Sequence, residues 1–127
     1  MQAAHLILYV RDQSRSTDFY RIALDSAARL DVPGMTEFEL RPGCVLGLMP
    51  EAGISRLIGP ALPDPVAGRA GARAELYLVV ADASAAHGRA IAAGGVELSA
   101  VAERSWGHRV GYVLDPDGHV LAFAEIA

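Results

Sequence analysis

The stretches HLILYVRDQS (His5–Ser14) and ELYLVVADAS (Glu75–Ser84) repeat one pattern about 70 residues apart. Leucine or valine stands at matching alternate positions of both stretches, and aspartate and serine then follow two residues apart. Alternating apolar residues predict a β-strand, and the Asp or Ser that follows predicts the N-cap of a helix. A further match of Val45–Met49 with Val120–Ala124 extends the repeat. The chain is therefore expected to consist of two similar half-domains.

The elements expected in each half follow from these patterns and from the turn residues between them. In the first half we expect a strand over 4–11, a helix over about 14–24, and strands over 26–32, 36–41 and 44–49. In the second half we expect a strand over 74–81, a helix over 83–93, and strands over 96–103, 109–114 and 119–126. The order βαβββ, repeated twice, predicts the α+β class.

The length of 127 residues suits one domain with its own core. We expect a single domain over 1–127, with module one over about 1–50, a linker over 51–73 and module two over about 74–127. The linker is rich in Gly and Pro, and Ile54, Leu57 and Ile58 suit a short helical turn within it. It serves either as a plain crossover or as a lid over a site.

The composition excludes several classes of partner. Hydrophobic residues make up 52% and charged residues 20%, which is typical of a globular chain and not of a disordered one. A net charge of −4 without a basic patch argues against nucleic acid and against anionic membranes. The lone Cys44 excludes an intrachain disulfide and, with no signal-peptide or membrane-spanning pattern, favours the cytoplasm.

The two faces of the repeated strands differ in character, because successive side chains of a strand point to opposite faces. The matched leucines and valines share one apolar face, which we expect to pack under a helix. The other face carries His5 and Tyr9 in one half but Glu75 and Tyr77 in the other, so we expect it to meet a ligand. Two further residues, Gly47 and Ala122, are small and match each other in the repeat. We expect them on the floor of a concave pocket between the halves.

These residues resemble the vicinal oxygen chelate superfamily, which includes glyoxalase I, bleomycin-resistance proteins, extradiol dioxygenases and fosfomycin-resistance proteins. The resemblance covers essentially the whole chain. It rests on His5, the helix entry Asp12–Tyr20, the strand Leu78–Asp82 and the run Gly111–His119. It implies two βαβββ modules that form an open, eight-stranded, cup-like barrel, and a homodimer.

The resemblance also implies where a metal would bind. Metal-dependent members hold a divalent ion with up to four side chains, and the matching positions here are His5, Gly47, Glu75 and Ala122. Glycine and alanine have no donor atom, which leaves two ligands where a catalytic metal normally has three. His108, on a loop, is the remaining candidate for a third ligand. We therefore favour no cofactor, with a divalent metal on His5 and Glu75 as the alternative.

In this respect the chain is more similar to the metal-free bleomycin-resistance proteins, which bind a small molecule. We expect an aromatic or amphipathic ligand enclosed between the modules. The alternative is a divalent-metal-dependent lyase or dioxygenase that uses His5, Glu75 and a third ligand. No catalytic residue is assigned, and whether the protein is an enzyme stays open. The candidate ligand-binding residues are His5, Tyr9, Gly47, Met49, Glu75, Tyr77, Trp106, Arg109 and Ala122.

Each candidate also has a structural interpretation. His5 could instead form a buried pair with Glu75, and Trp106 could cover the core. Arg109 binds either a ligand carboxylate or phosphate, or a surface acid. Tyr9, Tyr77 and Met49 could instead be packing residues of the core. We expect His119 to have a structural role and His87 to be exposed to solvent.

Overall fold

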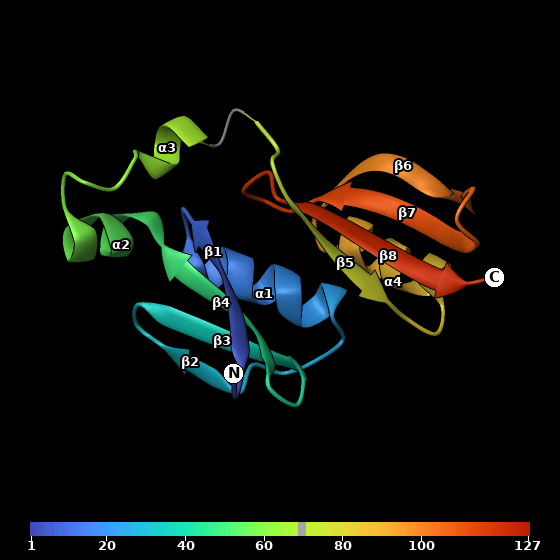
Figure 1. Cartoon of the computed structure of the whole chain (residues 1–127), viewed down its shortest axis with the longest axis horizontal. Coiled ribbons are helices and arrows are strands. Elements are labelled where there is room, and N and C mark those ends of the chain that lie inside the picture. The colour runs from blue at the N-terminus through green and yellow to red at the C-terminus, as the bar shows by residue number, and fades with distance from the viewer. Residues whose placement is uncertain (69–70) are drawn as a thin grey trace.

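The computed structural model describes residues 1–68 and 71–127 and shows two four-stranded sheets, each with its own helix (Figure 1). The first unit comprises β1 (Ala4–Val10), α1 (Gln13–Ala23), β2 (Leu30–Val32), β3 (Met35–Arg41) and β4 (Cys44–Pro50). The second comprises β5 (Glu75–Val79), α4 (Ala83–Ala92), β6 (Val96–Glu103), β7 (His108–Leu114) and β8 (Val120–Ile126). The predicted class and the order βαβββ, repeated twice, are confirmed.

The two sheets have the same topology, with strand orders β1-β4-β3-β2 and β5-β8-β7-β6. In each sheet the first strand pairs in parallel with the last, and the remaining pairs are antiparallel. The repeat extends to the register, because Ile7 lies opposite Gly47 and Tyr77 lies opposite Ala122. The sheets do not join into a closed barrel, and β1 and β5 are edge strands.

The repeated aspartates begin the helices. The Asp12 side chain accepts a hydrogen bond from the Arg15 backbone N–H at 3.1 Å, and Asp82 accepts one from Ala85 at 2.9 Å. Such a cap satisfies a backbone donor that has no partner within the helix. The sequence alone left Asp or Ser open as the cap, and the structure shows that Asp has this role in both units.

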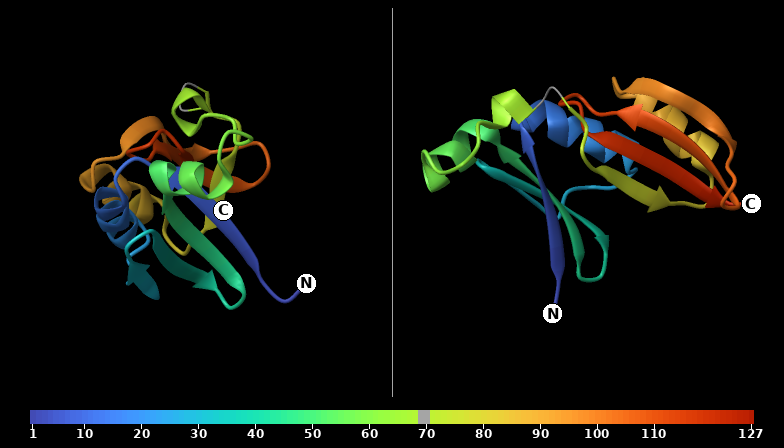
Figure 2. Two further views of the ribbon diagram at one scale, coloured as in Figure 1. Left: turned by 90° about the vertical axis from the view of Figure 1, so that its left-hand side faces the viewer. Right: turned by 45° about the horizontal axis from the view of Figure 1, so that its top comes forward.

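One hydrophobic core joins the two units. The helices α1 and α4 contact each other, and each packs on its own sheet (Figure 2). The buried core residues come from both units: Val10, Phe19, Tyr20, Ala23, Phe38, Leu46, Leu48, Ala86, Ala90, Val113, Leu121 and Phe123. Burial of each large apolar side chain stabilises the fold by about 2 kcal/mol. The core therefore lies on the helix side of both sheets.

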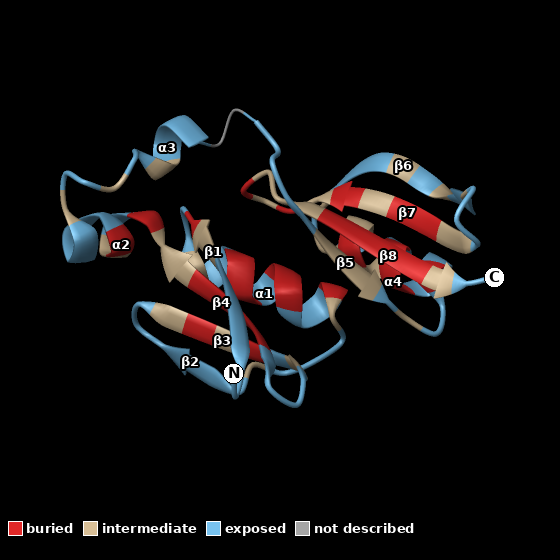
Figure 3. Cartoon of the chain, viewed as in Figure 1, coloured by how far each residue is buried: buried red, intermediate tan, exposed pale blue. Residues whose placement is uncertain are grey.

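We call the face of each sheet that lies opposite α1 or α4 the open face. Because each sheet turns its helix towards the other unit, its open face turns away from that unit. The burial pattern fits this arrangement, since the buried residues, red in Figure 3, lie on α1 and α4 and on the strands beside them. Leu6 was expected on the apolar face that packs under a helix, but it lies near the start of β1 and is 45% exposed.

The linker contains α2 (Glu51–Ile58) and the single turn α3 (Pro65–Gly68), and it spans one edge of the molecule (Figure 1). The predicted helical turn around Ile54 is therefore confirmed as α2. Among the described residues, the helices are too short or too polar to cross a membrane.

Candidate functional site

The open face of the second sheet carries a small apolar cluster. Val110, Ala122 and Ala124 are fully buried there, and Tyr77 and Tyr112 pack against them. The alanines come from β8, in which alternate residues point to this face. Small side chains on β8 let the two tyrosine rings lie close to the sheet. Ala122 thus lies under a layer of side chains, and it is not the floor of an empty pocket.

Three polar aromatic side chains join at the end of this face. The Trp106 indole Nε1–H donates to the Tyr77 hydroxyl oxygen at 3.0 Å, and that oxygen lies 2.7 Å from Nδ1 of His108. Because an indole N–H can only donate, the Tyr77 hydroxyl accepts from Trp106, whereas the direction of its bond with His108 depends on the His108 tautomer. We refer to Tyr77, His108 and Trp106 as the aromatic cluster.

The aromatic cluster is held in place and still accessible. Trp106 is 54% exposed although its indole N–H is hydrogen-bonded. The rings of Tyr77 and His108 lie with centroids 6.0 Å apart, tilted by 32°. A fixed and exposed aromatic surface can stack on a flat ligand without losing much side-chain freedom.

The open face of the first sheet has a different polar group. His5 Nδ1 lies 3.5 Å from a carboxylate oxygen of Glu37 on β3. Arg29 donates two hydrogen bonds to the other oxygen of Glu37, at 3.0 and 2.9 Å. Glu37 was not among the sequence candidates. The hairpin at Pro42–Gly43 is the signal that could have found it, because it brings Glu37 opposite Gly47.

Gly47 differs from its expected role as a pocket floor. A Cβ added at Gly47 would lie 3.1 Å from Cγ1 of Ile7 and 3.4 Å from the Met35 sulfur. The space that the glycine leaves is therefore used by these two side chains. Tyr9 and Met49 lie on the same face, and both are half-buried.

The expected pair of His5 with Glu75 is not formed in the single chain. His5 contacts Glu37, whereas Glu75 is exposed at the start of β5 in the other sheet. The reason is the packing of α1 on α4, which turns the two open faces away from each other. A pocket that includes both His5 and Glu75 cannot therefore be built within one chain.

Arg109 and His108 are neighbours that point to opposite faces of β7. Arg109 forms an ion pair with Glu125, and the same carboxylate accepts the Ala83 backbone N–H at the start of α4. Arg109 therefore lies on the helix side, apart from the other candidates. His108 lies on the open face with Tyr77. The sequence had proposed His108 only as a metal ligand.

Within one chain, the side-chain donors of the described residues do not fit a catalytic metal. Within residues 1–68 and 71–127, no group of three or more His, Cys, Asp or Glu side chains could hold a metal ion. Glu37, the acid beside His5, already accepts two hydrogen bonds from Arg29. A guanidinium on this carboxylate competes with a cation, so His5 and Glu37 do not form the start of a metal site.

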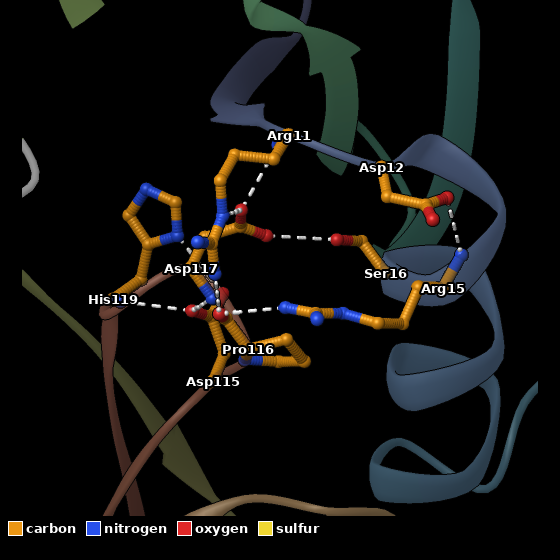
Figure 4. A network of polar contacts seen from close by, with 8 residues as sticks. All are labelled: Arg11, Asp12, Arg15, Ser16, Asp115, Pro116, Asp117 and His119. Carbon is orange, nitrogen blue, oxygen red and sulfur yellow. Dashed lines mark hydrogen bonds and ion pairs between the residues drawn. The ribbon is translucent and has the colours of Figure 1, made fainter. Parts of the chain in front are cut away.

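A partly buried polar network joins the turn between β7 and β8 to the start of α1 (Figure 4). Asp117 accepts from the Ser16 hydroxyl at 2.8 Å and from the Arg11 backbone at 2.9 Å. Arg11 and Arg15 both donate to the Pro116 carbonyl at 2.8 Å. The network ties the second unit to the first over more than 100 residues of sequence.

Asp115 is the centre of this network and is almost fully buried. The Tyr20 hydroxyl donates to its carboxylate at 2.6 Å, and Nδ1 of His119 lies 2.9 Å from the same oxygen. Burial disfavours the Asp115 carboxylate, but the hydrogen bonds and charge of His119, together with the hydrogen bond from Tyr20, outweigh burial and lower the pKa of Asp115. Burial, followed by the charge of Asp115, raises the pKa of Tyr20, so its hydroxyl stays protonated.

The pKa of His119 shifts in the opposite direction to that of Asp115. Burial alone would favour the neutral ring, but Asp115 first, and then the charges of Asp117 and Glu51, raise the pKa of His119. The sequence expected a structural role for His119, and its bond to Asp115 agrees with one. His87, by contrast, was expected to be solvated, but it is buried and bonds to Glu97 at 2.8 Å.

The pair of Asp115 with His119 predicts a pH-dependent contribution to stability. The raised pKa of His119 gives stability that is present below its unfolded value of 6.5 and is lost as pH rises through the folded pKa. The lowered pKa of Asp115 gives stability that is present above 3.8 and is lost on acidification. We expect His119→Asn to lower the free energy of unfolding by about 1–2 kcal/mol near about pH 5.5, and by less near about pH 9. Urea unfolding at both pH values measures this, and equal losses at both would contradict it.

Comparisons with known proteins agree with this fold. The sequence profile of the Glyoxalase/Bleomycin resistance protein/Dioxygenase superfamily matches residues 2–123. A glyoxalase-related enzyme from Fulvimarina pelagi is 25% identical, with a TM-score of 0.82 over 98% of this chain and 88% of that one. A protein of unknown function from Agrobacterium tumefaciens is 28% identical, with a TM-score of 0.80 over 100% and 95%. An uncharacterised protein of Mycobacterium bovis is 28% identical over 119 residues, which is 88% of this chain and 75% of the relative.

Proposed function

Because the chain belongs to the Glyoxalase/Bleomycin resistance protein/Dioxygenase superfamily, we propose that it binds a small aromatic or amphipathic molecule without an obligatory metal. The observation that carries this proposal is the aromatic cluster of Tyr77, His108 and Trp106. It presents a half-exposed indole beside two hydrogen-bonded rings. Such a surface suits a flat ligand, which stacks on the rings and exchanges a hydrogen bond with His108.

We place the functional form in a homodimer. The edge strands β1 and β5 expose apolar side chains next to the open faces, with Leu6 at 45%, Ile7 at 40% and Val79 at 56%. Exposed apolar edges of this kind favour pairing with another strand. The open face of the first sheet of one chain would then cover the aromatic cluster of its partner. A ligand would be enclosed between modules of different chains, in a cytoplasmic protein that has a single cysteine.

A divalent-metal-dependent lyase or dioxygenase is the less favoured function. The donor that the structure adds beside His5 is Glu37, and Arg29 already neutralises it. The ion pair between Arg29 and Glu37 therefore supports a polar wall for an organic ligand in place of a cation site.

Trp106 is the only tryptophan of the chain, which makes its fluorescence a direct probe of the site. We expect bleomycin or a planar anthracycline to quench it in a saturable way. Trp106→Ala should weaken binding by about tenfold or more in isothermal titration, because stacking contributes about 1–3 kcal/mol. Tyr77→Phe should weaken it less, since it keeps the ring and removes only the hydroxyl.

Leu57→Ala is the control for the titration, because Leu57 is 74% exposed on α2 and outside the proposed site. It should bind like the wild type. Native mass spectrometry of the same samples should show two chains with bound ligand and no stoichiometric metal. Unchanged affinity of Trp106→Ala would remove the aromatic cluster from the site. A metal that is lost on His5→Ala would favour the lyase or dioxygenase.

A further inference from the structure

Arg104 lies on the open face of the second sheet, in the same turn as Trp106. Its guanidinium carbon is 5.4 Å from the centre of the Tyr112 ring, which packs on Ala122. The strand register places Tyr77, Ala122 and Tyr112 side by side on three neighbouring strands. Neighbouring strands lie about 4.8 Å apart, so one small molecule can reach from the aromatic cluster to the guanidinium.

A β-bulge holds this guanidinium in place. Three residues of β6, from Ser99 to Ala102, lie opposite two residues of β7, and such a bulge leaves backbone groups without a partner in the sheet. Nη2 of Arg104 donates to the Val110 carbonyl at 2.9 Å and to the Ala100 carbonyl at 3.3 Å. It also donates to the Ser99 hydroxyl at 2.8 Å. All of these acceptors are neutral, so they fix the guanidinium without cancelling its charge.

The neighbouring acids do not pair with Arg104. Among the described residues, Nη1 of Arg104 has no hydrogen-bond partner, and no carboxylate forms an ion pair with this side chain. Glu97 bonds to α4, and Glu103 lies opposite Arg109, whose side chain points to the helix side. Glu75 lies on the open face, but on β5 at the far edge of the sheet. The open face therefore carries a fixed positive charge beside its aromatic rings.

We propose that the ligand of the aromatic cluster is an aromatic acid, with its ring stacked on Trp106 and its carboxylate on Arg104. This inference rests on the function proposed above and adds the chemical class of the ligand. A guanidinium forms charge-assisted hydrogen bonds with a carboxylate, and Nη1 of Arg104 is available for one. Because the bulge already holds the side chain, binding costs it little freedom. Arg104 thus selects the charge of the ligand.

Nuclear magnetic resonance titration with naphthoate and naphthamide tests the proposal, since the two share one ring system and differ in charge. At neutral pH, naphthoate should bind to the wild type about tenfold or more tightly than naphthamide. Naphthylmethylamine, which carries the opposite charge, should bind more weakly than the amide. Tighter binding of the amine than of the acid would overturn the proposal.

Variants of Arg104 separate its charge from its bonds at the bulge. Arg104→Gln should reduce the preference for the acid to about twofold or less, because it removes the charge. Arg104→Lys should keep most of the preference, since it keeps the charge and loses the planar bond pattern. Arg21→Gln is the matched control, because the Arg21 side chain is 55% exposed on α1, and it should leave the preference unchanged. The preference is a ratio of two affinities within one variant, so a general loss of structure does not create it.

Trp106→Ala separates this inference from the proposed function. It should weaken naphthoate and naphthamide by a similar factor. If it weakens neither ligand, the aromatic cluster is not the site and both proposals are wrong. If it weakens both ligands, but the wild type binds them equally, only the inference about Arg104 is wrong. A preference that persists in Arg104→Gln, or that is lost in Arg104→Lys as well, would also overturn it, because Arg104 would then only fill the bulge.

Discussion

Asp115→Ala is expected to lower the free energy of unfolding by about 3–5 kcal/mol, one of the two largest effects that we predict. The Asp115 carboxylate accepts four hydrogen bonds, from the Tyr20 hydroxyl, from the His119 ring, and from the backbone N–H groups of Asp117 and His119. Truncation would leave two side-chain donors and two backbone donors without their acceptor in a buried place. Urea unfolding followed by circular dichroism measures the loss.

Two variants bracket this result. Asp115→Asn keeps the shape and one acceptor oxygen, so its loss should be smaller than that of Asp115→Ala. Asp18→Ala removes a carboxylate of the same type from a surface pair with Arg21, in which the Asp18 side chain is 69% exposed. Its loss should stay below about 0.5 kcal/mol. A loss of that small size for Asp115→Ala would show that the network does not stabilise the fold.

Gly95→Ala is the second large effect, with an expected loss of about 2–3 kcal/mol. A Cβ at Gly95 would lie 2.5 Å from a methyl carbon of Val113 and 2.8 Å from the carbonyl oxygen of Ala90. It would also lie 3.2 Å from the carbonyl oxygen of Leu114. Because two of these atoms belong to the backbone of α4 and β7, a side-chain rotation cannot relieve the contact. Thermal and urea unfolding of the variant measure the loss.

Gly88→Ala is the matched control for Gly95→Ala. Gly88 lies within α4, and an added Cβ would meet nothing within 4 Å. Alanine costs less backbone entropy than glycine in a helix, so this variant should gain up to about 1 kcal/mol. Opposite signs for the same substitution, seven residues apart, would confirm that the close packing at Gly95 causes its loss. A loss at Gly88 would contradict this account.

The fold could be predicted from the sequence because its signals are local. The repeat of alternating leucines, followed by an aspartate, predicted the βαβββ order and helices that begin near 14 and at 83, and the helices begin at Gln13 and Ala83. Strand alternation also predicted that Ala122 lies on the face away from the helix, and it lies on the open face. A cap acts within three residues and a strand alternates with a period of two, so neither depends on distant partners.

The site could be predicted only in part. Tyr77 and Trp106 were proposed as ligand contacts, and the structure joins them through a hydrogen bond. His108, the other partner of Tyr77, is adjacent in sequence to Arg109. The two side chains lie on opposite faces of β7, so only His108 joins the aromatic cluster. The Asp115 network was not predicted. The sequence around Asp115 indicates a turn, but its partner Tyr20 lies 95 residues away, so no local pattern connects the two.

By itself, the sequence determined the duplicated βαβββ modules, the capped helices and an apolar face on each sheet. Only the tertiary structure decided how those faces are paired. The apolar faces of both modules gain most by burial in one core around α1 and α4, so the open faces turn outward. For that reason His5 contacts Glu37 of its own sheet and not Glu75.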